Sequence, residues 1–460
     1  MMKDILHWDL CTTVDAVKSR QISSYELTRW SIDRLKRIGT QLNAVFRLDE
    51  ESALKRALVL DDLQAHHRPL GLLHGVPLAH KDLIFMAGRT AHVGSKILKN
   101  HIPENNSVVM DYFEAAGQVY TGSLHMTEFA MGPTGFNQHY GHAKNPWNEL
   151  MVCGGSSSGS AIAVSARMVF GAIGSDTGGS IRHPATMCGV TGLKTSRQLV
   201  STEGVFPLAH TLDCVGPIAQ NARDCARMLT VLTNKQYDYE ALLNKSVKGL
   251  RIGIPKRYYW EGVDPEIEKV LLENVAIFQS LGLEIVELDN PEMATINQMM
   301  GILMGVESLQ VHHEWLKQSP DAYADQVRAR IEAGYLYSNE DYQNALTQIK
   351  KYQAQFNDQV FAHCDAMFIP TIQVHTPSIE ESTRGTLEEV LKGVGKITHV
   401  TKAINYLGLP SISVPGGFSS RKMPVGFQLV GQDLSEDILL RITHAYQTQT
   451  HWHHQLPPTA

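Results

Sequence analysis

The sequence of 460 residues lacks the features of a secreted disulfide protein or a membrane protein. Its six cysteines are scattered and none lies in a C-x-x-C pair, so we expect reduced, mostly buried thiols rather than a disulfide framework or a zinc site. No apolar stretch approaches the roughly 18 residues of a membrane span. The start, MMKDILHWDL, has no secretory signal pattern. These absences predict a soluble cytoplasmic protein that does not contact a membrane.

An excess of positive charge is also absent. Lys and Arg number 41 against 47 Asp and Glu, which gives a net charge of −6. Nucleic-acid binding therefore has no electrostatic support. Histidine is frequent, but pairs such as His66-His67 and His312-His313 lack the spacing that a zinc protease uses. We expect neither a metal nor a cofactor.

The pattern of apolar and turn residues predicts an α/β fold. Ser23 and Glu26 form a capping box that begins a helix ending near Gly39. Further on, Leu250 to Ile254 and Leu283 to Leu288 read as strands. The helix between them begins at Asp264-Pro265 and ends at Gly282. This βαβ unit predicts a mixed, mostly parallel central β-sheet with helices on both faces.

The remaining segments predict one large domain over residues 1–460. Residues from about 70 to 235 are rich in Gly and Ser, as catalytic loops on a rigid scaffold are. Residues 290–360 read as mostly helical. Strands are expected at 366–372, 410–415 and 425–430, followed by a closing helix. No long linker divides the chain.

Three segments carry residues suited to acyl transfer: Gly75–Asp82, Gly154–Ala161 and Gly174–Ala185. A serine hydroxyl becomes a nucleophile when a neighbouring base takes its proton. Lys81 can be that base if burial among its apolar neighbours lowers its pKa. Asp82 would act in the opposite direction and keep the amine charged. The sequence leaves both protonation states open.

The run from Thr177 to Ser180 is suited to binding an oxyanion. Gly178 and Gly179 allow a tight turn before the serine, so that successive N–H groups can converge on one point. Two other interpretations of the Gly/Ser loops fit less well. The Gly154–Ala161 loop lacks the lysine of a phosphate-binding P-loop, and it follows a loop rather than the strand that a nucleophile elbow requires.

Taken together, the segments resemble the amidase signature family. The pattern G-G-S-S-x-G-S-A is met at Gly154–Ala161, G-x-D-x-G-G-S-I-R-x-P-A at Gly174–Ala185, and the family lysine at Lys81. The resemblance implies a Lys–Ser–Ser triad. Ser180 would be the nucleophile, Ser156 on a cis peptide would relay the proton, and Lys81 would be the base. The backbone N–H groups of Thr177, Gly178, Gly179 and Ser180 would form the oxyanion hole, and no metal would be needed.

Other residues are assigned supporting or bland roles. We interpret Asp176 and Arg182 as an ion pair that steadies the turn before Ser180, with Ser157 as a further support. His183 is a neighbour rather than a catalytic group. A methionine cluster that includes Met300 and Met304 reads first as helical core and second as an adaptable pocket. Met131 is a third pocket candidate.

The resemblance leaves several activities open. Thr398 stands where the family's glutaminase subunits usually carry an acidic residue, and the 330–350 region reproduces their tyrosine-rich motif poorly. We therefore expect a stand-alone amidase, monomeric or homodimeric, that acts on a small amide, aryl amide or carbamate (a urethanase) with an apolar acyl or amine side. The alternatives are a glutaminase subunit of a tRNA-dependent amidotransferase and a non-catalytic amidase-fold binding protein.

Overall fold

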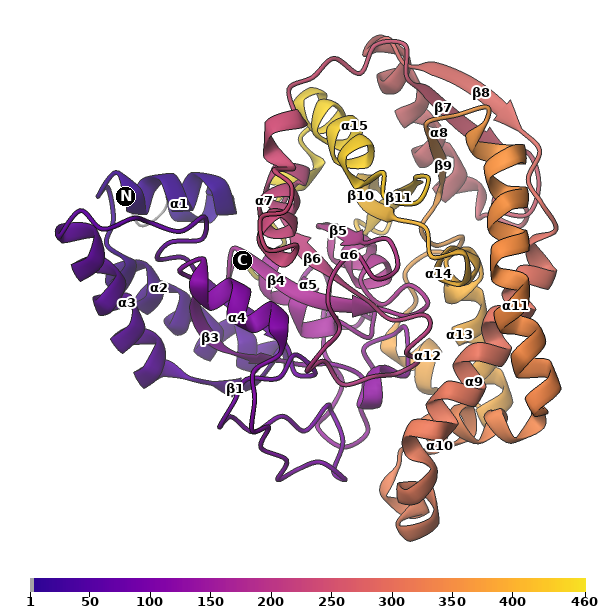
Figure 1. The fold of residues 1–460 in the computed structure, drawn as a ribbon, viewed down its shortest axis with the longest axis horizontal. Helices are drawn as coiled ribbons and strands as arrows, with labels where there is room; N and C mark the ends of the chain where they lie inside the picture. The colour runs from indigo at the N-terminus through magenta and orange to yellow at the C-terminus, as the bar shows by residue number, and fades with distance from the viewer. Residues whose placement is uncertain (1–3) are drawn as a thin grey trace.

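The computed structural model describes residues 4–460 and contains two β-sheets (Figure 1). The larger sheet has eight strands in the order β4-β6-β5-β10-β11-β9-β7-β8, and the smaller has the order β1-β3-β2. Strand β2 of the small sheet lies beside β4 of the large one. The strands are β1 Val45–Leu48, β2 Pro77–Lys81, β3 Val119–Leu124, β4 Gly171–Asp176, β5 Thr191–Lys194, β6 Cys214–Ala219, β7 Arg251–Pro255, β8 Glu284–Leu288, β9 Ala366–Pro370, β10 Ser411–Phe418 and β11 Pro424–Val430.

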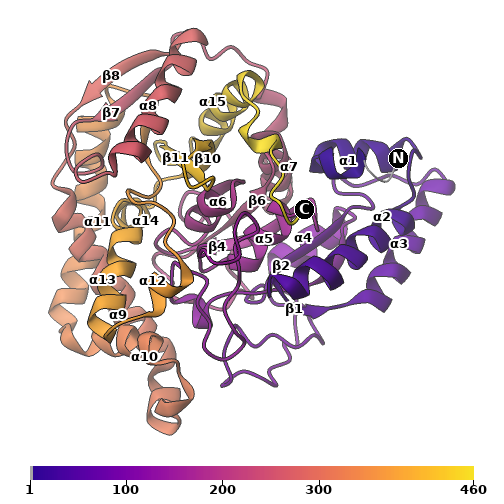
Figure 2. The same cartoon turned by 180° about the vertical axis from the view of Figure 1, so that it is seen from behind.

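Fifteen α-helices surround these sheets within the described residues. Helices α1 to α3 lie on the side of the small sheet, and α9 to α11 lie at the opposite end of the molecule in both views (Figures 1 and 2). The helices are α1 Leu10–Lys18, α2 Ser24–Arg34, α3 Glu50–Ala65, α4 Val108–Ala115, α5 Ser158–Ser165, α6 Arg182–Cys188, α7 Ala222–Leu232, α8 Pro265–Ser280, α9 Met293–Gln318, α10 Asp325–Glu332, α11 Asn339–Phe356, α12 Ile379–Thr383, α13 Leu387–Thr398, α14 Lys402–Leu407 and α15 Glu436–Gln449.

The large sheet is mixed, but the prediction that it is mostly parallel is wrong. Only the β7–β8 and β7–β9 pairs are parallel. The ladders that join β4, β6, β5, β10, β11 and β9 are all antiparallel. The one βαβ unit recognised in the sequence does form a parallel pair. The other strands pair with partners distant in sequence or across the short β10–β11 connection, where an antiparallel course needs no crossover helix.

Helices cover both faces of the large sheet, as predicted. Neighbouring residues of β11 point to opposite faces. The Phe427 ring packs against Phe278 of α8 and Tyr446 of α15. On the other face, the Gln428 side chain accepts a hydrogen bond from Arg182 of α6. The functional residues lie on this second, polar face.

Local sequence signals are confirmed where they depend on nearby residues. Both bonds of the Ser23–Glu26 capping box are present at the start of α2, and a π-helical turn continues the helix to Gly39. The Asp264 side chain caps α8, with Pro265 in the first turn. Within the described residues, the six cysteines are free and buried. No helix among residues 4–460 combines the length and the apolar character needed to cross a bilayer.

Candidate active site

Lys81 is the last residue of strand β2 and its side chain is completely buried. Its Nζ donates hydrogen bonds to Ser156 Oγ at 2.7 Å and to Ser175 Oγ at 2.8 Å. Ser156 lies in the loop before α5, and Ser175 lies in β4. The small sheet therefore brings one buried amine to two hydroxyl groups on separate elements.

Burial lowers the pKa of Lys81 to about 7 from its ordinary value of 10.5, while the carboxylates of Asp213 and Asp176 act in the opposite direction. A buried amine is costly to charge because the interior solvates an ion poorly. An appreciable fraction of Lys81 is therefore neutral near pH 7 and has a lone pair available to take a proton.

Asp82 does not determine the charge of Lys81, although it follows it directly. Its Oδ2 accepts hydrogen bonds from the backbone N–H groups of His92 at 3.0 Å and Val93 at 2.9 Å. The carboxylates that act on the Lys81 ammonium come instead from Asp213 and Asp176. Successive side chains of a strand point to opposite faces, so Lys81 and Asp82 diverge.

The two Gly/Ser loops meet beside Lys81. The backbone N–H of Ser157 donates to the carbonyl oxygen of Ser180 at 3.1 Å. The Ser157 hydroxyl donates to the carbonyl of Ser175 at 3.2 Å, which supports the positioning role expected for it. The peptide bond before Ser156 is cis, as the family resemblance implies. This network brings Ser156, which is bonded to Lys81, next to the backbone of Ser180.

Ser180 is the most exposed of the three predicted catalytic residues. Its side chain is 9% exposed and lines a cavity, whereas Lys81 and Ser156 are at 0%. Within residues 4–460 its hydroxyl forms no hydrogen bond with another protein group. A hydroxyl in this position is open to a substrate.

The turn before Ser180 holds N–H groups suited to an oxyanion, but fewer than predicted. The N–H of Gly179 donates to Asp176 Oδ1 at 2.7 Å, so its inclusion in the oxyanion hole is wrong. The carboxylate folds back over this turn and also accepts from the N–H of Ile181 at 3.1 Å. The N–H groups of Thr177, Gly178 and Ser180 have no such partner within the described chain.

Asp176 and Arg182 form the ion pair that the sequence suggested, and both side chains are completely buried. Arg182 Nε and Nη2 each lie 3.0 Å from the carboxylate, and Asn405 Nδ2 donates to it at 2.9 Å. Burial disfavours the ionised carboxyl, but Arg182 outweighs burial and holds its pKa well below the usual range. The pair is structural and steadies the loop that carries Ser180.

His183 lines the same cavity but does not reach Ser180. Its Nε2 lies 2.9 Å from Thr401 Oγ1, and the Thr401 hydroxyl donates to the carbonyl of Gly178 at 2.6 Å. Burial lowers the pKa of His183 to about 3, so the ring is neutral. The interpretation of His183 as a neighbour therefore agrees with its contacts.

The cavity beside Ser180 has about 340 Å³ of empty space. Met300 and Met304 of α9 line it, together with Leu208 and Pro133, so both methionines lie where the pocket interpretation expects them. Met131 is 1% exposed and packs in the core, so its assignment to the pocket is wrong. The adjacent Ala130 and Gly132 line the cavity instead, because Met131 points away from it.

The sequence interpretation missed four residues of the site. Ser175 is a hydrogen-bond partner of Lys81, and Asp213 accepts a hydrogen bond from Thr177 at 2.6 Å. Arg330 of α10 and Lys402 of α14 line the cavity. Only Ser175 and Asp213 had a signal, because they lie inside or near the recognised motifs. Arg330 and Lys402 come from helices far along the chain.

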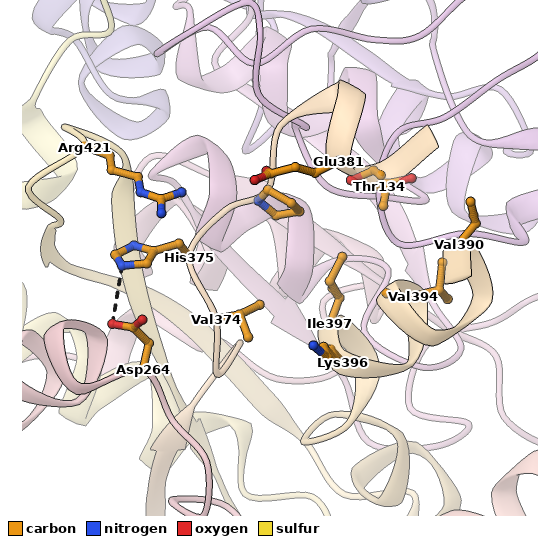
Figure 3. Close-up of a pocket in the computed structure, with 13 residues that line it drawn as sticks. Thr134, Asp264, Val374, His375, Glu381, Val390, Val394, Lys396, Ile397 and Arg421 are labelled. Carbon is orange, nitrogen blue, oxygen red and sulfur yellow. Dashed lines mark ion pairs between the residues drawn. The ribbon is translucent and has the colours of Figure 1, made fainter. Parts of the chain in front are cut away.

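A second cavity lies beyond helix α13 and does not contain the predicted triad (Figure 3). Ile397 lines this second cavity, whereas the next residue, Thr398, lines the cavity of Ser180. Its polar groups are largely paired with one another. The His375 Nε2, for example, lies 3.3 Å from Asp264 Oδ1 in Figure 3.

Comparisons with known proteins agree with this geometry. The chain matches the Amidase family over residues 26–440. The chain belongs to the amidase signature family. It is 34% identical to the amidase-type subunit of the glutamyl-tRNA(Gln) amidotransferase from Nitrosomonas europaea, over 96% of this chain and 97% of that protein.

Solved amidase structures have the same fold as this chain. One described as an amidase has a TM-score of 0.88 and 27% identity, and covers 96% of this chain and 100% of its own. A peptide amidase solved with the inhibitor chymostatin has a TM-score of 0.84 and 25% identity, and covers 96% and 97%. This amidase signature protein is therefore a hydrolase that acts on carbon–nitrogen bonds other than peptide bonds.

Proposed function

We propose that this protein cleaves the C–N acyl bond of a small amide or carbamate through an acyl-enzyme on Ser180. The observation that carries the proposal is the 2.7 Å hydrogen bond from Lys81 Nζ to Ser156 Oγ, in a site where the Ser157 N–H also bonds to the Ser180 carbonyl. A neutral amine, a relay hydroxyl and an open hydroxyl are the groups that serine acyl transfer needs.

In the first half-reaction, Ser180 Oγ attacks the substrate carbonyl carbon. Its proton passes to Ser156 Oγ as the Ser156 proton passes to the neutral Lys81 amine. The N–H groups of Thr177, Gly178 and Ser180 stabilise the oxyanion that forms. The C–N bond then breaks, and Lys81 returns the proton through Ser156 to the leaving nitrogen. An acyl ester on Ser180 and a free amine or ammonia result.

In the second half-reaction, water attacks the acyl ester. Lys81 again takes a proton, through Ser156, and returns it to Ser180 Oγ as the ester bond breaks. The products are a carboxylic acid from an amide, or a carbonic acid monoester from a carbamate. Water is the only co-reactant, so the atoms balance without an oxidant or a reductant.

A glutaminase role within a larger complex is the second candidate, and the similarity to the glutamyl-tRNA(Gln) amidotransferase protein favours it. Against it, Thr398 lines the cavity where glutaminase subunits usually carry an acidic residue. Free glutamine has an α-ammonium group that needs an acceptor of this kind. We therefore favour hydrolysis by the chain alone.

The test is hydrolysis of a panel of amides, aryl amides, carbamates and esters by the purified chain, with mass spectrometry of the acylated or sulfonylated protein. The proposal expects turnover without a partner and a covalent adduct on Ser180 that the Ser180→Ala variant cannot form. An adduct on another residue, or turnover that survives in Ser180→Ala, would refute the assigned nucleophile. Activity confined to glutamine plus a partner protein would favour the second candidate.

A further inference from the structure

Two basic side chains, those of Arg330 and Lys402, line the cavity of Ser180. Neither forms an ion pair or a hydrogen bond with any group in the part of the chain that the structure describes. Arg330 Nη1 is buried without a partner. By contrast, Arg328 on the same helix is paired with Asp321 and Glu332.

Both side chains approach the catalytic loops. A Cβ atom built on Gly178 would lie 3.9 Å from Lys402 Cγ, and one built on Gly132 would lie 3.8 Å from Arg330 Nη1. Gly132 in turn packs against Gly155, which precedes Ser156: a Cβ atom built on Gly155 would lie 2.6 Å from the Gly132 carbonyl oxygen. The two cations therefore flank the place where the substrate carbonyl must sit.

The cavity has no anionic side chain to balance them. No Asp or Glu lines it, and its remaining titratable side chain, His183, is neutral. Burial, together with the nearby charge of Arg330, lowers the pKa of Lys402 to about 8. Burying unpaired charge destabilises a fold, so residues of this kind are retained where a ligand supplies the opposite charge.

We propose that Arg330 and Lys402 bind a carboxylate group of the substrate, so that the natural substrate is a monoamide of a dicarboxylic acid. This inference rests on the proposed function and names its substrate class. The planar guanidinium of Arg330 can hold a carboxylate through two parallel hydrogen bonds, and Lys402 adds a point charge. Met300, Met304 and Leu208 accommodate the methylene chain between the two carbonyl carbons.

The same charges exclude an α-amino acid amide. The α-ammonium group of glutamine would face two cations and no carboxylate in the cavity. A glutamine analogue that lacks only the amino group, glutaramate, satisfies both requirements. The expectation from the sequence that the acyl side is purely apolar is therefore replaced by a chain that is apolar in the middle and anionic at its end.

The experiment compares three amides of similar size: glutaramate, the uncharged valeramide and L-glutamine. We expect kcat/KM for glutaramate to exceed that for valeramide by about 10- to 100-fold, the range of a charge-assisted hydrogen bond. Glutamine should be the poorest of the three. In Lys402→Met and in Arg330→Met, the ratio of glutaramate to valeramide should fall by roughly 10-fold or more. The matched control Arg328→Met should leave both rates unchanged.

Binding supplies a readout that does not depend on turnover. Calorimetry of glutaramate with Ser180→Ala should give a dissociation constant that weakens by about 10-fold or more when Lys402→Met is added. Equal turnover of glutaramate and valeramide, or an unchanged dissociation constant, would overturn the carboxylate site while leaving the amidase intact. Binding of glutaramate without turnover of any amide by the native protein would support the carboxylate site and refute the proposed function.

Discussion

The backbone N–H of Ser157 donates a hydrogen bond of 3.1 Å to the carbonyl oxygen of Ser180. This bond joins the loop before α5 to the loop before α6, and it places the relay serine and the proposed nucleophile on adjoining backbones. Because Ser157 also bonds to the backbone of Ser175 in β4, both loops are held against a rigid strand. Pre-organisation of this kind is what acyl transfer requires, since a small misplacement of the reacting atoms is costly.

The pH dependence of the reaction should follow Lys81. Burial lowers its pKa to about 7, so the neutral amine that can accept a proton predominates above that pH. We expect kcat/KM to rise with pH through about 7 and then to level off. Steady-state assays from pH 5 to 9 check this, using a substrate that does not itself titrate in the range. Full activity at pH 5 would contradict Lys81 as the base.

Lys81→Met should separate activity from stability. The variant is expected to lose activity by a factor of roughly 10³ or more. Because the folded-state pKa of Lys81 lies below its ordinary value of 10.5, the unfolded chain binds the extra proton between about pH 7 and 10.5. The stability gained by the variant is therefore largest at or below pH 7 and shrinks as the pH rises.

Urea unfolding of both proteins at several pH values measures this difference. The advantage of Lys81→Met should decline by about 1.4 kcal/mol per pH unit above neutrality. A constant difference between pH 7 and pH 9.5 would show that the amine has the same pKa in the folded and unfolded chain.

The two serines should behave as one unit. Ser180→Ala and Ser156→Ala are each expected to reduce kcat by about 10³-fold or more, and the double variant should be little worse than the more severe single one. Rates of single and double variants on one amide substrate check this. Multiplicative losses would mean that Ser156 and Ser180 act independently, and would argue against the relay.

Breaking the buried Asp176–Arg182 pair should destabilise the fold. Arg182→Met leaves the Asp176 carboxylate buried with only neutral partners, at a cost of about 3–5 kcal/mol. Guanidinium chloride unfolding measures the loss. Lys55→Met is the control, since its exposed pair with Glu51 contributes about 1 kcal/mol or less. Similar unfolding midpoints for both variants would contradict a structural role for the buried pair.

The two glycines before Ser180 should differ in their tolerance of alanine. Gly179 has a φ of +125°, and a Cβ there would overlap the His183 ring, so Gly179→Ala should displace the loop and lower kcat by about 100-fold or more. At Gly178 the nearest atom to a new Cβ is the flexible Met300 Cε at 3.1 Å. Gly178→Ala should therefore fold normally.

Circular dichroism and kinetics of both alanine variants check this contrast. Gly178→Ala should mainly raise KM, because the methyl group narrows the cavity rather than moving the loop. Equal loss of kcat in the two variants would show that cavity width, not loop geometry, limits the reaction.

Short-range patterns predicted part of this protein well. The capping box of Ser23 and Glu26, the strands around α8, and the glycines around Ser180 each depend on interactions within a few residues. The spacing of motifs also identified Lys81 and Ser156, which the structure joins by a hydrogen bond. The mostly parallel sheet was predicted wrongly, because one βαβ unit says nothing about strands that pair across the rest of the chain.

The amino-acid sequence by itself determined the local turns, the helix ends and the types of residue available for acyl transfer, because these follow from backbone geometry and side-chain chemistry over short distances. Only the tertiary structure decided that Ser175 bonds to Lys81, that Met131 turns into the core, and that Arg330 and Lys402 share the cavity of Ser180. Those outcomes depend on how helices and strands from distant parts of the chain pack, which no local pattern encodes.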